Sequence, residues 1–233
     1  MTKEKENHNH ERISKYIRDV YILPESINSI IKELISECDD WKEISETLKD
    51  IITFAGYIKR YIDFSIIEDE RIIEDLIKFD PGIITYIPGQ PEHLCILSLE
   101  YANKDKTIYN SPDKIFRYSI DSKNQTDKIC ELAMSKCGIV LNRVVKQTDK
   151  ICLIAVKQNG LALRFVKNKT DEICIEAIKQ NPEAIKYIDN IEQNVYIEAV
   201  ANKIKELHKY IKDNDQLIEL EETLIRMILA MKK

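Results

Sequence analysis

The stretch TDKICLIAVKQNGLALRFVKNK, residues 148–169, is followed at once by TDEICIEAIKQNPEAIKYIDNI, residues 170–191. Ten of the 22 positions are identical, and most of the others exchange similar residues. Segments starting at Thr126 and Glu192 continue the same 22-residue register, and a segment starting at Asp69 fits the same pattern. A period of this length predicts a structural unit that is repeated along the chain.

The apolar residues of a unit follow a helical period. In the copy that starts at Thr148, positions 4, 8 and 9 are Ile151, Ala155 and Val156, which fall on one stripe of a helix. The Thr-Asp start supplies an N-cap oxygen and a first-turn carboxylate. Asn159 at position 12, followed by Gly or Pro, ends this helix and begins a second one. We therefore predict a helix of about 11 residues, a tight turn at Gly160 and a helix of about 7 residues.

Helices this short are marginal in water when isolated. Stacked hairpins bury their apolar stripes against one another, which is the principle of an α-solenoid. Alanine at position 8 would let neighbouring helices approach to about 8–10 Å. The sequence therefore predicts an all-α protein, an α-solenoid of about 22-residue helical hairpins with non-repeat helical caps at both ends.

The period also predicts where the array begins and ends. Segments starting at Pro91 and Pro112 look like first halves of units with altered or shortened second halves. In the C-terminal stretch DQLIELEETLIRMILAMKK the acidic residues precede the final lysines, which suits a capping helix better than a membrane anchor. We predict a disordered tail at 1–11, an N-terminal helical cap at 12–68, helical-hairpin repeats at 69–213 (irregular at 104–125) and a capping helix at 214–233.

Composition narrows the class of protein. The 233 residues carry a net charge of only −5, so no global field marks a nucleic-acid or membrane protein. No apolar run approaches the ~20 residues that span a bilayer, and the N-terminus lacks the apolar core of a secretory signal. We expect an intracellular protein whose six cysteines are free thiols.

The pattern TD-x-IC-x-x-A-[VI]-KQN-[GP]-x-A-[LI]-x-[FY]-[VI] resembles a helical repeat family of unknown function that is common in giant double-stranded DNA viruses. The resemblance covers roughly residues 69–212 and is strongest from 126 to 191. It implies the fold and a viral origin, which would place the protein in the host cytoplasm or the virion, and it carries no catalytic residues. A weaker similarity links residues 23–51, LPESINSIIKELISECDDWKEISETLKDI, to the opening of an F-box. That similarity would imply docking to the adaptor subunit of a ubiquitin ligase. The alternative, which we favour, is a helical cap.

Nothing in the sequence predicts an enzyme. The chain contains no phosphate-binding loop, nucleophile elbow or metalloprotease motif, and no cofactor is implied. Cysteines recur at position 5, but equivalent positions of packed helices lie about 8–10 Å apart, whereas zinc thiolates must lie within about 4 Å of one another. We therefore predict buried thiols with no metal at Cys95, Cys130, Cys152 and Cys174.

One row of residues predicts binding. Between Arg143 and Lys186, nine Lys or Arg face five Asp or Glu, a net charge of +4 in an acidic protein. The row is either a solvated face or a surface for an acidic partner or nucleic-acid phosphates. We expect a non-enzymatic macromolecule-binding scaffold or adaptor that uses the side of the solenoid. A protein partner is favoured, nucleic acid is the alternative, no membrane is expected, and the oligomeric state is unassigned. The candidate partner-binding residues are Lys157, Arg164, Lys167 and Lys186.

Overall fold

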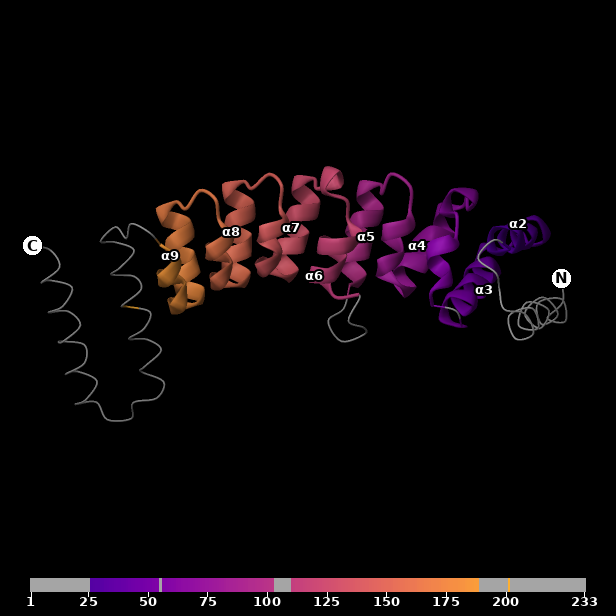
Figure 1. Ribbon diagram of the computed structural model, residues 1–233, viewed down its shortest axis with the longest axis horizontal. Coiled ribbons are helices and arrows are strands. Elements are labelled where there is room, and N and C mark those ends of the chain that lie inside the picture. The colour runs from indigo at the N-terminus through magenta and orange to yellow at the C-terminus, as the bar shows by residue number, and fades with distance from the viewer. Residues whose placement is uncertain (1–25, 55, 103–109, 189–200, 202–233) are drawn as a thin grey trace, which may run out of the picture. The chain divides into compact units, whose positions relative to one another are not determined.

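The computed structural model describes residues 26–54, 56–102, 110–188 and 201 (Figure 1). All regular structure in these ranges is helical, and consecutive helices pack on one another, so the predicted all-α helical repeat is confirmed. None of the described helices is long and apolar enough to cross a membrane. The chain divides into two compact units, unit 1 (residues 1–126) and unit 2 (residues 127–233).

The described part of unit 2 consists of hairpins in which an α-helix, the first helix, is followed by a short 3₁₀ helix, the second helix. The first helices lie side by side in Figure 1. In chain order the helices are α7 (Asp127–Lys136), η6 (Gly138–Arg143), α8 (Asp149–Gln158), η7 (Gly160–Phe165), α9 (Asp171–Gln180) and η8 (Pro182–Tyr187).

The predicted caps set the hairpin boundaries. Thr148 Oγ1 accepts a hydrogen bond from the backbone N–H three residues on at 3.3 Å, and Thr170 repeats this bond at 3.4 Å. Asn159 Oδ1 and Asn181 Oδ1 each accept from the N–H two residues on at 3.0 Å, which starts the second helix. These side chains satisfy backbone donors that a helix start leaves unpaired.

The first helices bury the predicted stripe, including alanine at position 8. Ala155 and Ala177 are fully buried. A Cβ added to Gly138 would collide with the Ala155 carbonyl oxygen, and one added to Gly160 would collide with that of Ala177. Neither glycine has a positive φ, so the predicted turn role of Gly160 needs a different reason. Glycine opens η6 and η7 because the backbone of the following hairpin passes too close for a side chain.

Glutamine side chains bridge neighbouring hairpins of unit 2. Gln158 Oε1 accepts from the N–H of Gly138 at 2.7 Å, while its Nε2 donates to the carbonyl of Lys136 at 3.3 Å. One repeat later, Gln180 accepts from the N–H of Gly160 in the same way. The bridge joins the end of each first helix to the turn of the hairpin before it.

A second bridge starts at position 22. Gln147 Nε2 donates to the carbonyl of Leu141 at 3.3 Å and to that of Phe165 at 3.0 Å. Its Oε1 accepts from the N–H of Lys167 at 3.0 Å. One amide thus ties the C-terminal ends of two successive second helices together.

Unit 1 contains the same two kinds of helix, in hairpins of unequal length. The helices are α2 (Ile27–Glu37), α3 (Trp41–Phe54), η1 (Ile58–Tyr61), η2 (Phe64–Ile66), α4 (Glu70–Phe79), η3 (Pro81–Tyr86), α5 (Glu92–Tyr101), α6 (Pro112–Lys114), the π-helical turn η4 (Ile115–Ser119) and η5 (Ser122–Asn124). In Figure 1, α4 and α5 lie side by side.

The segment that starts at Pro112 is not the first half of a unit, which corrects the sequence interpretation. Gln90, at position 22 of its unit, donates to Ile84 O at 3.1 Å and to Ser119 O at 2.6 Å, and accepts from Asp121 N at 2.7 Å. Gln147 makes the same set of bonds in unit 2, so Ser119 corresponds to Phe165. Because η4 also packs on η3, α6 and η4 form the second helix of the hairpin that α5 begins.

The hairpin arrangement extends into the segment before residue 69, where the 22-residue period is absent. Asn28 Nδ2 donates to the carbonyl of Tyr61 at 3.1 Å, and its Oδ1 accepts from the N–H of Asp63 at 2.8 Å. We call Asn28, Gln90 and Gln147 the amide clamps. Asn28 bonds Tyr61 and Asp63 as Gln147 bonds Phe165 and Lys167, so Tyr61 ends a second helix, as Phe165 does. The helix η1 is therefore the second helix of a hairpin, and α3, which precedes it, is the first.

Hydrogen bonds and ion pairs hold α3 on α4. Ser45 Oγ donates to Asp75 Oδ2 at 2.6 Å, and Lys49 Nζ lies 2.6 Å from the same oxygen. The residues Cys-Asp-Asp at 38–40 separate α2 from α3. The predicted tail at 1–11 and capping helix at 214–233 lie outside the described residues.

Candidate functional site

Three lysines on the first helices of unit 2 are paired with carboxylates. Lys157 Nζ lies 3.6 Å from Glu176 Oε2 on the next hairpin, and Lys179 Nζ lies 3.2 Å from the other oxygen of this glutamate. Lys150 reaches back to Glu131 at 2.7 Å. This side of unit 2 therefore carries alternating charge, and the predicted site residue Lys157 belongs to it.

Arg164 and Lys186 occupy equivalent positions on η7 and η8, two second helices that pack on each other. Both side chains are exposed. The Arg164 guanidinium lies 4.5 Å from the ring centroid of Phe165, and Lys186 Nζ lies 5.4 Å from that of Tyr187. The hydrogen bond to Glu183, at 3.1 Å, raises the pKa of Lys186. The structure thus brings together two of the four predicted site residues, each with an aromatic neighbour.

Lys167 lies in the link that follows η7. Its backbone N–H is held by Gln147, and its Nζ donates to the carbonyl of Val145 at 3.3 Å. The four predicted residues accordingly divide between a first helix, two second helices and a link. Their roles in partner binding stay predictions.

The cysteines at position 5 are buried, as predicted. Cys95 and Cys130 are at most 2% exposed, and burial raises the pKa of each thiol to about 11. Burial also raises the pKa values of Cys152 and Cys174. Within the described ranges, no three His, Cys, Asp or Glu side chains gather closely enough to hold a metal ion.

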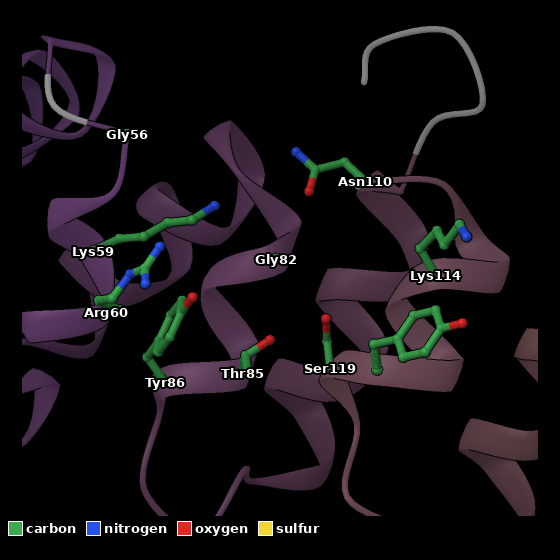
Figure 2. Close-up of a pocket in the computed structure, with 10 residues that line it drawn as sticks. Gly56, Lys59, Arg60, Gly82, Thr85, Tyr86, Asn110, Lys114 and Ser119 are labelled. Atoms are coloured by element: carbon green, nitrogen blue, oxygen red, sulfur yellow. The ribbon is translucent and has the colours of Figure 1, made fainter. Parts of the chain in front are cut away.

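Unit 1 contains a pocket that the sequence analysis missed. It has a volume of about 640 Å³ and lies among three successive second helices, η1, η3 and the α6–η4 pair (Figure 2). Its lining is polar and aromatic, with basic residues and hydroxyl groups: Gly56, Lys59, Arg60, Gly82, Thr85, Tyr86, Asn110, Lys114, Tyr118 and Ser119.

The pocket has a positive balance of charge. Three cations line it, and the only carboxylate paired with any of them within the described ranges is Asp80, 2.6 Å from Lys59 Nζ. Arg60 donates from Nε to the carbonyl of Tyr57 at 3.2 Å. Lys114 Nζ lies 5.3 Å from the ring centroid of Tyr118. Neither Arg60 nor Lys114 forms an ion pair with any described carboxylate.

The 22-residue register does not predict this pocket, because η1 and the Pro112 segment fall outside it. The adjacent basic pair Lys59-Arg60 is the one signal of the pocket in the sequence. Lys114 lies across the pocket from this pair because the Pro112 segment forms a second helix.

Comparisons with known proteins add one likeness. Searches of curated proteins and of solved structures find no match. A family model described as "Domain of unknown function (DUF4116)" matches residues 149–191, which begin with α8 and contain η7, α9 and η8. The matched part of the chain is therefore the regular hairpin pair of unit 2, which is similar to a family whose function its description leaves open.

Proposed function

We propose that this chain is a non-enzymatic scaffold that binds a protein partner through the exposed side chains of its second helices, here called the second-helix surface. One recurring observation carries the proposal: a cation lies beside an aromatic ring on these helices in both units. The pairs are Arg60–Tyr61, Lys114–Tyr118, Arg164–Phe165 and Lys186–Tyr187.

Such pairs suit a protein interface. Aromatic and arginine side chains are enriched at the energetic centres of interfaces, because they bury a large area with few rotatable bonds. A cation held over a ring also loses less freedom when a partner covers it. The resemblance to a viral repeat family would make the partner a host or virion protein.

The charge pattern of unit 2 favours a protein over nucleic acid. Glu176 and Glu183 lie within 4 Å of three of the lysines that gave the sequence its local positive charge. Phosphate backbones bind rows of cations without such partners. A surface of mixed charge is instead typical of the polar rim of a protein interface.

The test is quantitative capture of partners from the native source by the full chain and two charge-reversed variants. The first variant combines Arg164→Glu with Lys186→Glu on the second helices. The matched control combines Lys150→Glu with Lys157→Glu on the first helices. We expect a protein that the first variant loses and the control retains.

Two results would overturn the proposal. One is a partner captured equally by all three proteins. The other is retention of random-sequence DNA or RNA that falls steeply with added salt and is abolished by the first variant, which would make the surface a nucleic-acid site. The F-box similarity of residues 23–51 remains a separate prediction, tested by binding of the ubiquitin-ligase adaptor subunit to the full chain.

A further inference from the structure

We propose that the pocket of unit 1 binds the phosphate group of a phosphorylated side chain on the protein partner. The proposed function supplies the partner, whereas the chemistry follows from the pocket itself. The pocket lies among second helices, so a segment bound there would also contact the second-helix surface.

Charge is the first reason. Arg60 and Lys114 come from different walls of the pocket, and within the described ranges neither forms an ion pair with a carboxylate. The third cation, Lys59, is already compensated by Asp80. A phosphate monoester carries a charge of about −1.5 to −2 near neutral pH and offers three acceptor oxygens. It therefore matches two uncompensated cations better than a single carboxylate would.

Neutral donors complete the site. Hydroxyl groups of Thr85, Tyr86 and Ser119 lie along one wall in Figure 2, with the Asn110 amide across from Lys59. Asn110 Oδ1 is buried and has no hydrogen-bond partner among the residues that the structure describes. A buried amide without a partner is unfavourable, and rotation by half a turn would present its NH₂ group in place of its oxygen. A bound phosphate oxygen would accept from that group.

The source of the phosphate follows from size and backbone geometry. A volume of about 640 Å³ exceeds what one phosphate fills and suits a larger group. The N–H of Gly82 is held by Asp80 Oδ1 at 3.0 Å, so it is not free to bind a phosphate as in a nucleotide-binding loop. Recognition falls to side chains with arginine among them, as in phosphopeptide-binding modules. Exposed Tyr57, Tyr61 and Tyr118 lie on or beside the lining helices, where residues flanking the phosphorylated side chain would pass.

The experiment measures binding of the full chain to degenerate peptide libraries with a central phosphoserine, phosphothreonine or phosphotyrosine, and to the same libraries without phosphate. Adenosine monophosphate is the probe for a nucleotide source. The variants are Arg60→Ala and Lys114→Ala. Lys123→Ala is the matched control, because this exposed lysine of unit 1 pairs with Asp121 at 3.4 Å and does not line the pocket.

We expect one phosphorylated library to bind at least about tenfold more tightly than its unphosphorylated form, since charged hydrogen bonds are the strong ones. Arg60→Ala and Lys114→Ala should each weaken this binding about tenfold, and Lys123→Ala by less than about twofold. Binding should also weaken below about pH 6, where the phosphate loses its second charge.

Equal binding with and without phosphate, tighter binding of adenosine monophosphate, or an equal effect of Lys123→Ala would each overturn the proposal. Its failure is separable from that of the scaffold proposal. If no phosphopeptide binds while Arg164→Glu with Lys186→Glu still releases a captured protein, only the pocket proposal falls. If phosphopeptides bind as expected while that variant releases nothing, only the second-helix surface of unit 2 loses its role.

Discussion

Units 1 and 2 build the same stack of hairpins from sequences that differ in regularity. In unit 2 the hairpins keep a 22-residue register, with a threonine cap, a buried alanine and an asparagine cap in each of two successive copies. In unit 1 the register is broken and the links differ in length. An amide clamp nevertheless bonds the end of a second helix in both units, through Asn28 and Gln90 in one and Gln147 in the other.

The difference shows that the contacts between hairpins, and not the sequence period, determine the fold. A sequence period appears when every link has the same length. The stack itself depends on close approach of backbones and on hydrogen bonds between neighbouring hairpins, which tolerate unequal links. Unit 1 keeps the hydrogen bonds between neighbouring hairpins although its links differ in length.

The largest loss of stability should come from adding a methyl group where two backbones of unit 2 approach each other closely. Gly160→Ala places a methyl group against the Ala177 carbonyl, which cannot move aside as a flexible side chain could. We expect the free energy of unfolding to fall by about 3 kcal/mol, measured by urea denaturation followed by circular dichroism. Gly89→Ala in unit 1 is the control. Its added Cβ meets nothing within 4 Å, so only its positive φ of 72° opposes the change, at about 1 kcal/mol. Equal losses would contradict the close-approach explanation.

Removing an amide clamp from each unit tests whether the two clamps are equivalent. Gln90→Ala and Gln147→Ala each remove two hydrogen bonds donated to carbonyls and one accepted from a backbone N–H. We expect each substitution to lower the free energy of unfolding by about 2 kcal/mol. Trp41 fluorescence measures the unfolding of unit 1, and circular dichroism measures that of the whole chain.

Gln147→Glu sharpens this test. The glutamate can still accept from Lys167 N–H but cannot donate to the two carbonyls, so it should be no more stable than the alanine variant. A loss at Gln147 with none at Gln90 would mean that the broken register of unit 1 relies on other contacts.

A smaller effect is expected at the helix caps. Thr170→Ala removes the oxygen that accepts from Ile173 N–H and should cost about 1 kcal/mol, whereas Thr170→Ser should restore most of it. The measurement is hydrogen exchange of the first-turn amides of α9. If serine restores nothing, the threonine methyl group and not its oxygen stabilises the helix start.

The last effect, absent at neutral pH, is a pH dependence shared by both units. Burial raises the pKa values of Cys95 in unit 1 and Cys130 in unit 2 from 9.0 to about 11, so the folded state keeps protons that the unfolded chain releases above pH 9. Stability should be constant below pH 9 with respect to these groups and fall between pH 9 and 11. Cys95→Ala and Cys130→Ala should each flatten this decline in urea titrations. A decline unchanged by either substitution would assign it to other groups, such as the lysines.

The sequence predicted unit 2 closely because its key residues act locally. Thr148 and Asn159 cap helices two or three residues away, and Cys152 and Ala155 belong to a stripe that its spacing reveals. The clamp residues could not be identified in this way. Gln147 bonds a carbonyl 18 residues ahead, which no local pattern indicates. The equivalent position one repeat later is Lys169, so the repeat does not predict a glutamine there.

The pocket was hidden for a related reason. Lys59 and Lys114 are far apart in sequence, and their proximity depends on recognising η1 and α6–η4 as successors in one row of second helices. Of the predicted site residues, Arg164 and Lys186 occupy position 17 of successive copies and lie on η7 and η8, which pack on each other. Lys157 lies instead on the first helix α8, where it pairs with Glu176, and no spacing rule in the sequence indicated this pair.

The unequal links have an evolutionary consequence. Residues 102–111 separate α5 from α6, whereas Cys137 alone separates α7 from η6. The clamp at Gln90 and the bond from Ser98 Oγ to the carbonyl of Pro81 lie outside that long link. Insertions can therefore accumulate at this junction without disturbing the neighbours, and Asn110 shows that they can furnish a wall of a cavity. The junction is a natural place for a lineage to acquire new recognition, and for a designer to graft a loop.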